Sequence, residues 1–359
     1  MADVIAPMSL SPLASERSSW ESRLGDLQVD YAVHGTLQSV GKQILVKIVL
    51  LNVHEHATPV WSDSYGLPLD ALGEADERVT TKLVARIDPV ILFIEGTRPG
   101  VRNPSDATRL ALRAIPLLST MEKRSYEEAG QMLRRAVAQA PEHSMAAAWL
   151  AYWHLFNVGQ GWSSDPVAEY LEVERLAQKA IQLDPENAEA LGIYGQICSY
   201  VHHDFDAAMH YFHRALVLNP SLAFIWALSA PTSCYIGDPD DALRRLKRYQ
   251  ELAPFDPYFK LFETMYTVVH VFRRDYEKAV LVGRRSVRAN PDFTNGYKPL
   301  LAALGHLGET EEASRYLREL LRREPGFSIQ SFARRYPFRR EEDREQYING
   351  LRKAGVPEA

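Results

Sequence analysis

The sequence predicts a mainly α-helical protein, a right-handed solenoid of about six helix pairs preceded by a small α+β unit. Two patterns predict this fold class. A phrase of small and apolar residues that ends in a proline recurs from residue 120 onward. Before it, between residues 28 and 66, β-branched residues gather in short, partly alternating runs, as they do in strands. The composition, with 46% hydrophobic and 24% charged residues, is that of an ordinary globular chain.

The recurring phrase places an Ala, an apolar residue four positions later and a small residue three further on along one stripe of a helix. Clear copies begin at Ala129, Ala208, Ala242 and Ala313, and the small residues on these stripes are expected to be buried between paired helices. Six prolines end the clear and the degenerate copies: Pro141, Pro185, Pro220, Pro254, Pro291 and Pro325. They are 44, 35, 34, 37 and 34 residues apart. A period near 34 is typical of the tetratricopeptide repeat, so a tetratricopeptide solenoid is expected over residues 105–327.

Two repeats depart from the pattern. The spacing of 44 implies ten extra residues between the helices of the second pair, in a loop around residues 158–166. The fifth copy has Gly283 and Ser286 on its stripe, which predicts looser packing or longer helices. After the last repeat, residues 341–354 read as an amphipathic helix that caps the open end of the solenoid, and residues 328–359 are assigned to this cap and tail.

Residues 28–100 read as a separate α+β unit. The runs 29–37 and 43–53 flank a Gly-containing turn and predict a hairpin, and a third short strand is expected over 59–65. Residues 72–92 have helical periodicity. The first 27 residues have no such pattern and are expected to be poorly ordered.

Three segments of this unit resemble the second half of the TolB-like domain: YAVHGTL at 31–37, VKIVLL at 46–51 and VWSDSY at 60–65. The tail, with YPFR at 336–339 and GLRKAGVP at 350–357, also resembles bacterial regulators in which a TolB-like domain precedes a tetratricopeptide array. Such regulators begin with a winged-helix DNA-binding domain or a class III adenylate cyclase domain. The resemblance therefore implies the sensory or docking half of such a regulator, either as a relative without an effector domain or as the C-terminal part of a longer protein.

Charge and cysteine content narrow the class of function. Lys and Arg number 41 against 46 Asp and Glu, a net charge of -5, which disfavours direct binding to nucleic acid. The most apolar run, residues 44–51, is too short to cross a bilayer, so no membrane association is expected. Two cysteines, Cys198 and Cys234, do not make a disulfide framework. These features predict a cytoplasmic protein.

The residues suggest no catalytic constellation, and no cofactor is expected. Four histidines, His202, His203, His210 and His213, lie within twelve residues, and the last two are one helical turn apart. Imidazoles at that spacing can share a metal ion. However, no cysteine or acidic residue completes a recognisable ligand set, so a polar helix face is the favoured interpretation and metal binding stays open.

The concave face of such an array is the better candidate for function, because its first helices line a groove that can hold a protein or peptide partner. The register of the prolines points six polar and aromatic residues toward this groove: Tyr152, Gln196, Tyr200, Tyr235, Asn295 and Lys298. We expect them to be exposed and to matter for binding more than for stability. Apolar residues at Phe224, Leu228 and Val268 leave a second interpretation open, that the array's own tail fills the groove.

Taken together, these features predict a non-catalytic protein–protein interaction scaffold or sensory module in bacterial regulation, signalling or transcription control. Two alternatives remain. The chain could be a sensor that holds a small molecule between the α+β unit and the first repeats. It could also be the regulatory C-terminal part of a longer adenylate cyclase. The sequence does not indicate the partner, the signal or the oligomeric state.

Overall fold

The computed structural model describes residues 30–41, 43–53, 58–68, 107–253 and 259–359, together with positions 87, 91 and 94. The chain divides into two compact units, residues 1–83 and residues 84–359. The first 27 residues, which were expected to be poorly ordered, lie outside the described part, as does Pro254. The helix predicted over 72–92 also lies there almost entirely, although Ile87 is helical and buried.

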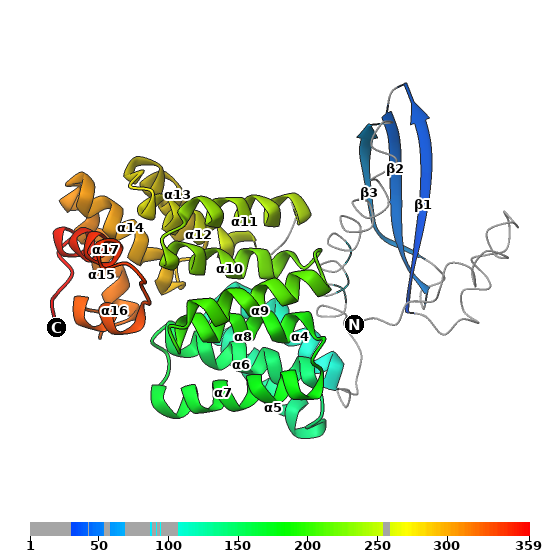
Figure 1. The fold of residues 1–359 in the computed structure, drawn as a ribbon, viewed down its shortest axis with the longest axis horizontal. Helices are drawn as coiled ribbons and strands as arrows, with labels where there is room; N and C mark the ends of the chain where they lie inside the picture. Colours follow the sequence, from blue (N-terminus) through cyan, green and yellow to red (C-terminus); the bar gives the residue numbers. More distant parts are fainter. Residues whose placement is uncertain are drawn as a thin grey trace, which may run out of the picture. The chain divides into compact units, whose positions relative to one another are not determined.

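The first unit contains an antiparallel sheet in the order β1-β2-β3 (Figure 1). Its strands are β1 (Tyr31–Val40), β2 (Gln43–Asn52) and β3 (Thr58–Pro68). The β1–β2 hairpin turns at Gly41, whose φ of 62° lies in the left-handed region that glycine adopts without strain. Ile48 and Leu50 of the central strand are buried. The predicted hairpin and third strand are therefore confirmed.

Within the second unit, residues 107–253 and 259–359 form a solenoid of six helix pairs followed by two further helices (Figure 1). The first helices of the pairs, here called the inner helices, are α4 (Ala107–Thr120), α6 (Ser144–Gly159), α8 (Ala188–Tyr200), α10 (Ala223–Ile236), α12 (Phe259–Phe272) and α14 (Thr294–Leu307). The second or outer helices are α5 (Lys123–Gln139), α7 (Pro166–Leu183), α9 (Phe205–Leu218), α11 (Pro239–Leu252), α13 (Tyr276–Ala289) and α15 (Thr310–Arg323). Each inner helix packs on the outer helix that follows it and on the inner helices of neighbouring pairs. The predicted tetratricopeptide solenoid is thus confirmed.

The small residues of the repeat lie where paired helices touch. Ala208, Ala215 and Ala242 are completely buried, as predicted. The helices α10 and α14 are capped at their C-terminal ends by Gly237 and Gly308. The φ values of these glycines, 95° and 76°, lie in the left-handed region that a glycine C-cap adopts. The repeat phrase therefore marks both the contact stripes and the helix ends.

The fifth pair packs closely, contrary to the expectation of looser packing. A Cβ at Gly283 would lie 3.1 Å from atoms of Leu300 and of Thr267, so glycine is what allows the close approach. Ser286 is buried and its hydroxyl is hydrogen-bonded to that of Thr264 on α12. Because the serine hydroxyl is hydrogen-bonded across the helix pair, its burial costs little free energy.

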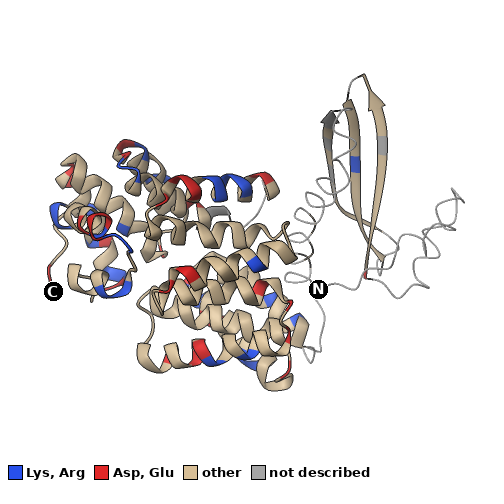
Figure 2. Ribbon diagram, viewed as in Figure 1, with Lys and Arg blue, Asp and Glu red and all other residues tan. Residues whose placement is uncertain are grey.

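Inner and outer helices differ in their surroundings. Every residue of α10 from Ala227 to Tyr235 is buried, and so is every residue of α14 from Gly296 to Gly305. Figure 2 shows that α11 carries charges of both signs, whereas α10 carries none. A helix that is apolar on all sides must be covered on all sides. In α10 and α14, the faces that point away from the outer helices are therefore covered as well.

The C-terminal tail, residues 328–359, supplies part of this cover. It forms α16 (Ile329–Arg335) and α17 (Glu341–Lys353), and α17 packs on α14 and α12, which are both inner helices. The crossing with α14 is very close, because Gly305 and Gly350 face each other without side chains. The end of the chain is tied back to α16 by a 2.8 Å hydrogen bond from the Ile329 amide to the Pro357 carbonyl. The predicted terminal helix is present and covers the inner face of the last repeat.

The loop inserted after α6 covers another part of the inner face. Gln160 is completely buried, and its Oε1 accepts hydrogen bonds from the backbone amide and the hydroxyl of Thr294, at 3.0 and 2.8 Å. Thr294 begins α14, so the second and sixth helix pairs meet across the inner face. The ten-residue insertion thus connects distant repeats. None of the described helices is long and apolar enough to cross a membrane.

Substituting Gly305 by Ala should destabilise the solenoid. An added Cβ would lie 1.9 Å from the backbone oxygen of Gly350, and a backbone atom cannot rotate away as a side chain can. We expect the free energy of unfolding to fall by about 2 kcal/mol or more in a urea titration. Gly326→Ala is the control, because nothing lies within 4 Å of its added Cβ. Equal stability of the two variants would show that α17 does not pack on α14 as described.

Candidate functional site

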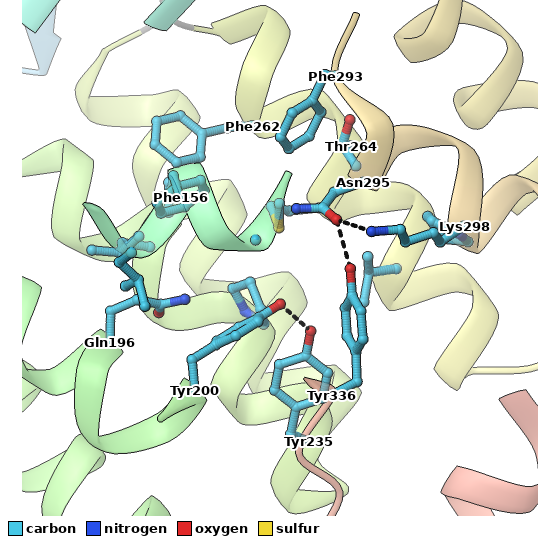
Figure 3. Close-up of a pocket in the computed structure, with 18 of the residues that line it drawn as sticks. Phe156, Gln196, Tyr200, Tyr235, Phe262, Thr264, Phe293, Asn295, Lys298 and Tyr336 are labelled. Atoms are coloured by element: carbon cyan, nitrogen blue, oxygen red, sulfur yellow. Dashed lines mark hydrogen bonds between the residues drawn. The ribbon is translucent and has the colours of Figure 1, made fainter. Parts of the chain in front are cut away.

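The six residues selected from the sequence surround one cavity of about 60 Å³ inside the solenoid, here called the interior site (Figure 3). Tyr152 comes from α6, Gln196 and Tyr200 from α8, and Tyr235 from α10; Asn295 and Lys298 come from α14. Other lining residues come from α6, α10, α12, the start of the sixth pair and the tail, among them Phe156, Leu228, Phe262, Thr264, Val268, Phe293, Tyr336 and Tyr347. The repeat register therefore brings all six to one place.

Their exposure differs from the expectation. Tyr152, Gln196, Tyr235 and Lys298 are between 0% and 4% exposed, and Tyr200 and Asn295 are half-buried. The prediction of an open groove with exposed residues was therefore wrong. The physical reason is the tail, since Tyr336 and Tyr347 form part of the same lining. The alternative interpretation, in which the array's own tail fills the groove near Leu228 and Val268, is the one that the structure shows.

Aromatic rings form most of the wall. The hydroxyls of Tyr200 and Tyr235 are hydrogen-bonded at 2.9 Å, and the Tyr336 ring lies 6.0 Å from that of Tyr200. Burial raises the pKa of Tyr200 to about 12, even though its hydrogen bond to Tyr235 acts to lower it. These phenols stay neutral near pH 7, so they act as hydrogen-bonding and packing groups rather than as bases.

A buried charged cluster lies at one side of the site. Lys298 Nζ is 3.1 Å from Glu324 Oε2, and Arg335 forms an ion pair with Oε1 of the same carboxylate. Glu324 ends the last repeat and Arg335 belongs to α16, so one carboxylate joins α14, α15 and the tail. Burial alone would raise the pKa of Glu324, but the two cations outweigh it and hold that pKa below its ordinary value. The carboxylate is therefore ionised at neutral pH.

Two amide side chains complete the polar groups. Asn295 Oδ1 accepts hydrogen bonds from Lys298 Nζ and from Tyr336 Oη, both at 2.6 Å (Figure 3). Its Nδ2 consequently points away from them, toward the cavity. Gln196 is 4% exposed, and its buried Oε1 has no hydrogen-bond partner. An unpaired buried acceptor costs about 1–3 kcal/mol.

The repeat register does not predict Tyr336 in the lining of this site, or Glu324 and Arg335 in the charged cluster beside it. Nor does it predict the contact of Gln160 with Thr294. The sequence does indicate that Lys298 is unusual, because it is the only Lys, Arg, Asp or Glu in the apolar stretch that forms α14. A lone lysine at the centre of a buried helix needs an anion. No comparable pattern distinguishes Glu324 from the other residues that precede the repeat prolines.

The histidines do not gather into a site. His202, His203, His210 and His213 are exposed, and His202 pairs with Glu174 at 2.8 Å. Within the described residues, no group of three or more His, Cys, Asp or Glu side chains could hold a metal ion. Cys198 and Cys234 are buried free thiols.

A curated fungal protein and several solved structures are similar to parts of this chain. No family model matches the chain. The bimA protein of Emericella nidulans is 22% identical over 177 residues, which make up 49% of this chain and 21% of that protein. This chain thus spans about a fifth of the relative's length.

Solved helical-repeat structures are similar in architecture. A monomeric mutant of IFIT1 with Gppp-AAAA has a TM-score of 0.50 at 15% identity, over 69% of this chain and 57% of that one. The APC/C hetero-tetramer Cut9–Hcn1 has a TM-score of 0.49 at 12% identity, over 70% and 46%. A thermophilic tetratricopeptide protein of Thermus thermophilus has a TM-score of 0.42 at 13% identity, over 55% and 98%. At these identities the likeness concerns the fold alone.

The charged cluster predicts a pH dependence of stability. Burial lowers the pKa of Lys298 from 10.5 to about 8, although Glu324 acts to raise it. Between these two values the unfolded chain holds a proton that the folded chain does not, so stability rises with pH there. The Lys298→Met variant has no amine to titrate at this position, so its stability lacks this rise with pH. The free energy of unfolding of the parent minus that of the variant should therefore increase between about pH 8 and about pH 10.

The control is Lys247→Met, because Lys247 is exposed on α11. Its difference from the parent should stay constant over the same range. Denaturant titrations at several pH values measure both differences. A Lys298 difference that is flat or falls with pH would contradict the burial of a positive charge at this position.

Proposed function

We propose that this chain is a non-catalytic protein–protein interaction module in bacterial regulation or signalling, and that the inner face of its solenoid recognises an extended peptide segment. The two resemblances drawn from residues 31–65 and 336–357 support placing it among regulators with a TolB-like domain. The solenoid fold supports a docking role, since such arrays commonly bind peptides along their inner helices. Cytoplasmic location belongs to the same proposal.

One observation carries the proposal: an extended segment of the chain itself lies on the ends of the inner helices. Tyr336 and Arg340, which bound this segment, have extended backbone angles. The Tyr336 hydroxyl donates to Asn295, and the Arg339 amide donates to the backbone oxygen of Tyr235 at 2.9 Å. The Phe338 ring lies 5.7 Å from that of Tyr235. The segment therefore uses backbone hydrogen bonds and aromatic contacts, as bound peptides do.

Four of the six residues chosen from the sequence take part in this contact. Tyr200 and Tyr235 contact the tail's aromatic rings, and Asn295 accepts from Tyr336. Lys298 Nζ lies 5.4 Å from the centre of the Tyr336 ring. Outside the interior site, Arg339 pairs with Asp206 at 2.6 Å. A partner that binds here would carry an aromatic–Pro–aromatic–Arg sequence similar to residues 336–339 and would replace the tail segment.

A peptide of residues 333–342 tests this function. In the parent chain the attached segment competes at an effective concentration of order millimolar, so the free peptide should bind poorly. Phe338→Ala weakens the attached segment, and we expect the labelled peptide to bind this variant at least about tenfold more tightly than the parent, by fluorescence anisotropy. Arg334→Ala is the control variant, because Arg334 is exposed in α16.

A second peptide, with alanine at the positions of Tyr336 and Phe338, controls for nonspecific binding. A folded Phe338→Ala variant that binds both peptides equally, or neither, would contradict peptide recognition by the inner face. Circular dichroism establishes that the variant is folded. The control Arg334→Ala should bind the peptide as poorly as the parent does.

A further inference from the structure

Two consecutive arginines, Arg339 and Arg340, end the extended tail segment that lies on the inner helices. The backbone at Arg340 is extended, with φ of -105° and ψ of 127°, and successive side chains of an extended chain point to opposite sides. The Arg339 amide donates to the backbone oxygen of Tyr235, which lies in the last turn of α10. This hydrogen bond fixes where the two side chains begin, and each arginine reaches a different part of the solenoid.

The first arginine contacts the start of α9. Arg339 Cζ lies 5.3 Å from the centre of the Phe205 ring, within the range of a cation–π contact. Arg339 Nη2 donates to Asp206 Oδ1 at 2.6 Å. Phe205 is buried in the solenoid, whereas Asp206 beside it is exposed. The two residues thus present an aromatic surface with a carboxylate next to it, an arrangement that fits a planar guanidinium group.

The second arginine contacts the C-terminal end of α10. Gly237, the C-cap residue of this helix, has no side chain, and a Cβ at its position would overlap the Nε and Cζ atoms of Arg340. The guanidinium group of Arg340 therefore lies directly against the backbone of the C-cap residue. The carbonyl end of a helix carries a partial negative charge, which favours a cation at this position.

We propose that the peptides recognised by the inner face carry two consecutive arginines directly after the aromatic–Pro–aromatic segment, and that the solenoid selects arginine over lysine at both positions. This inference rests on the peptide docking proposed above and names the partner's chemistry. The first arginine of the partner contacts Phe205 and Asp206, and the second lies against Gly237.

Lysine would keep the positive charge at each position but would lose the planar contact. An ammonium group is compact and strongly hydrated, whereas a guanidinium group stacks on a flat surface while its edge donates hydrogen bonds. The Arg339 side chain is 41% exposed and Arg340 is exposed as well. Exposed ion pairs are weak and are screened by salt, so charge alone contributes little here. The selectivity therefore comes from the contacts with Phe205 and Gly237.

Substitution of the chain's own arginines by lysine tests the inference. Arg339→Lys and Arg340→Lys should each weaken the attached segment, which competes with the labelled peptide of residues 333–342. We expect the peptide to bind each variant about fivefold more tightly than the parent, by fluorescence anisotropy. Arg334→Lys is the matched control, because Arg334 is exposed in α16, and it should bind the peptide as the parent does. All three variants keep the positive charge, including the one that acts on Asp343.

The reciprocal experiment places lysine in the peptide. The Phe338→Ala variant is titrated with the peptide of residues 333–342 and with two versions that carry lysine at the position of Arg339 or of Arg340. Each lysine version should bind at least about fivefold more weakly than the arginine peptide. The peptides compared have equal charge, so a difference in affinity reports the shape of the cationic group.

The outcomes separate this inference from the docking on which it rests. Equal binding of the three peptides, or lysine variants of the chain that bind as the parent does, would overturn the selectivity for arginine and leave peptide docking intact. An effect at only one of the two positions would contradict recognition of an arginine pair. Binding of none of the peptides to any variant would overturn the docking itself. The lysine variants of the chain do not require Phe338→Ala, so they decide if that variant does not fold.

Discussion

The shared ion pair of Glu324 is the interaction on which the interior of this protein depends. Its carboxylate is 4% exposed and connects Lys298 of α14 with Arg335 of α16. Leaving one of these charges unpaired would cost several kcal/mol, so the three groups hold one another in place. The loop after α6 also lies against Glu324, since a Cβ at Gly161 would be 3.0 Å from the Glu324 side chain. The last repeat, the tail and the inserted loop therefore meet at one carboxylate.

This closure changes what a tetratricopeptide array can do. In an open array the inner helices face solvent and can receive a long peptide. Here Ala227–Tyr235 of α10 and Gly296–Gly305 of α14 are buried, and the remaining space is a cavity of about 60 Å³. The closure is made by residues outside the repeat phrase, namely Gln160 in the inserted loop and Tyr336 in the tail. The repeats provide the scaffold, and the two irregular segments determine what the interior can bind.

The sequence predicted the fold well because the repeat phrase repeats the same contact six times. Ala208 and Gly237 could be placed as contact and helix end, since small residues and left-handed glycines have few other uses at those offsets. The same register also predicted that the side chains of Tyr152 and Lys298 point to the inner face of the solenoid. It did not predict their burial, because burial depends on contacts between segments far apart in the chain, such as Gln160 with Thr294. Nor did it predict the pairing of Lys298, since the repeat phrase fixes no position for Glu324 or Arg335.

Hydrogen exchange at the backbone amide of Thr294 tests the closure most directly. This amide begins α14 and donates to Gln160 Oε1 at 3.0 Å, so its protection reports contact between the second and sixth helix pairs. The closed interior predicts exchange slowed by on the order of 10⁴ or more relative to an unstructured chain. Gln160→Ala should abolish this slowing and leave the amide of Leu300, inside the same helix, protected. Exchange of the Thr294 amide within about tenfold of the unstructured rate in the intact protein would show that the solenoid is open.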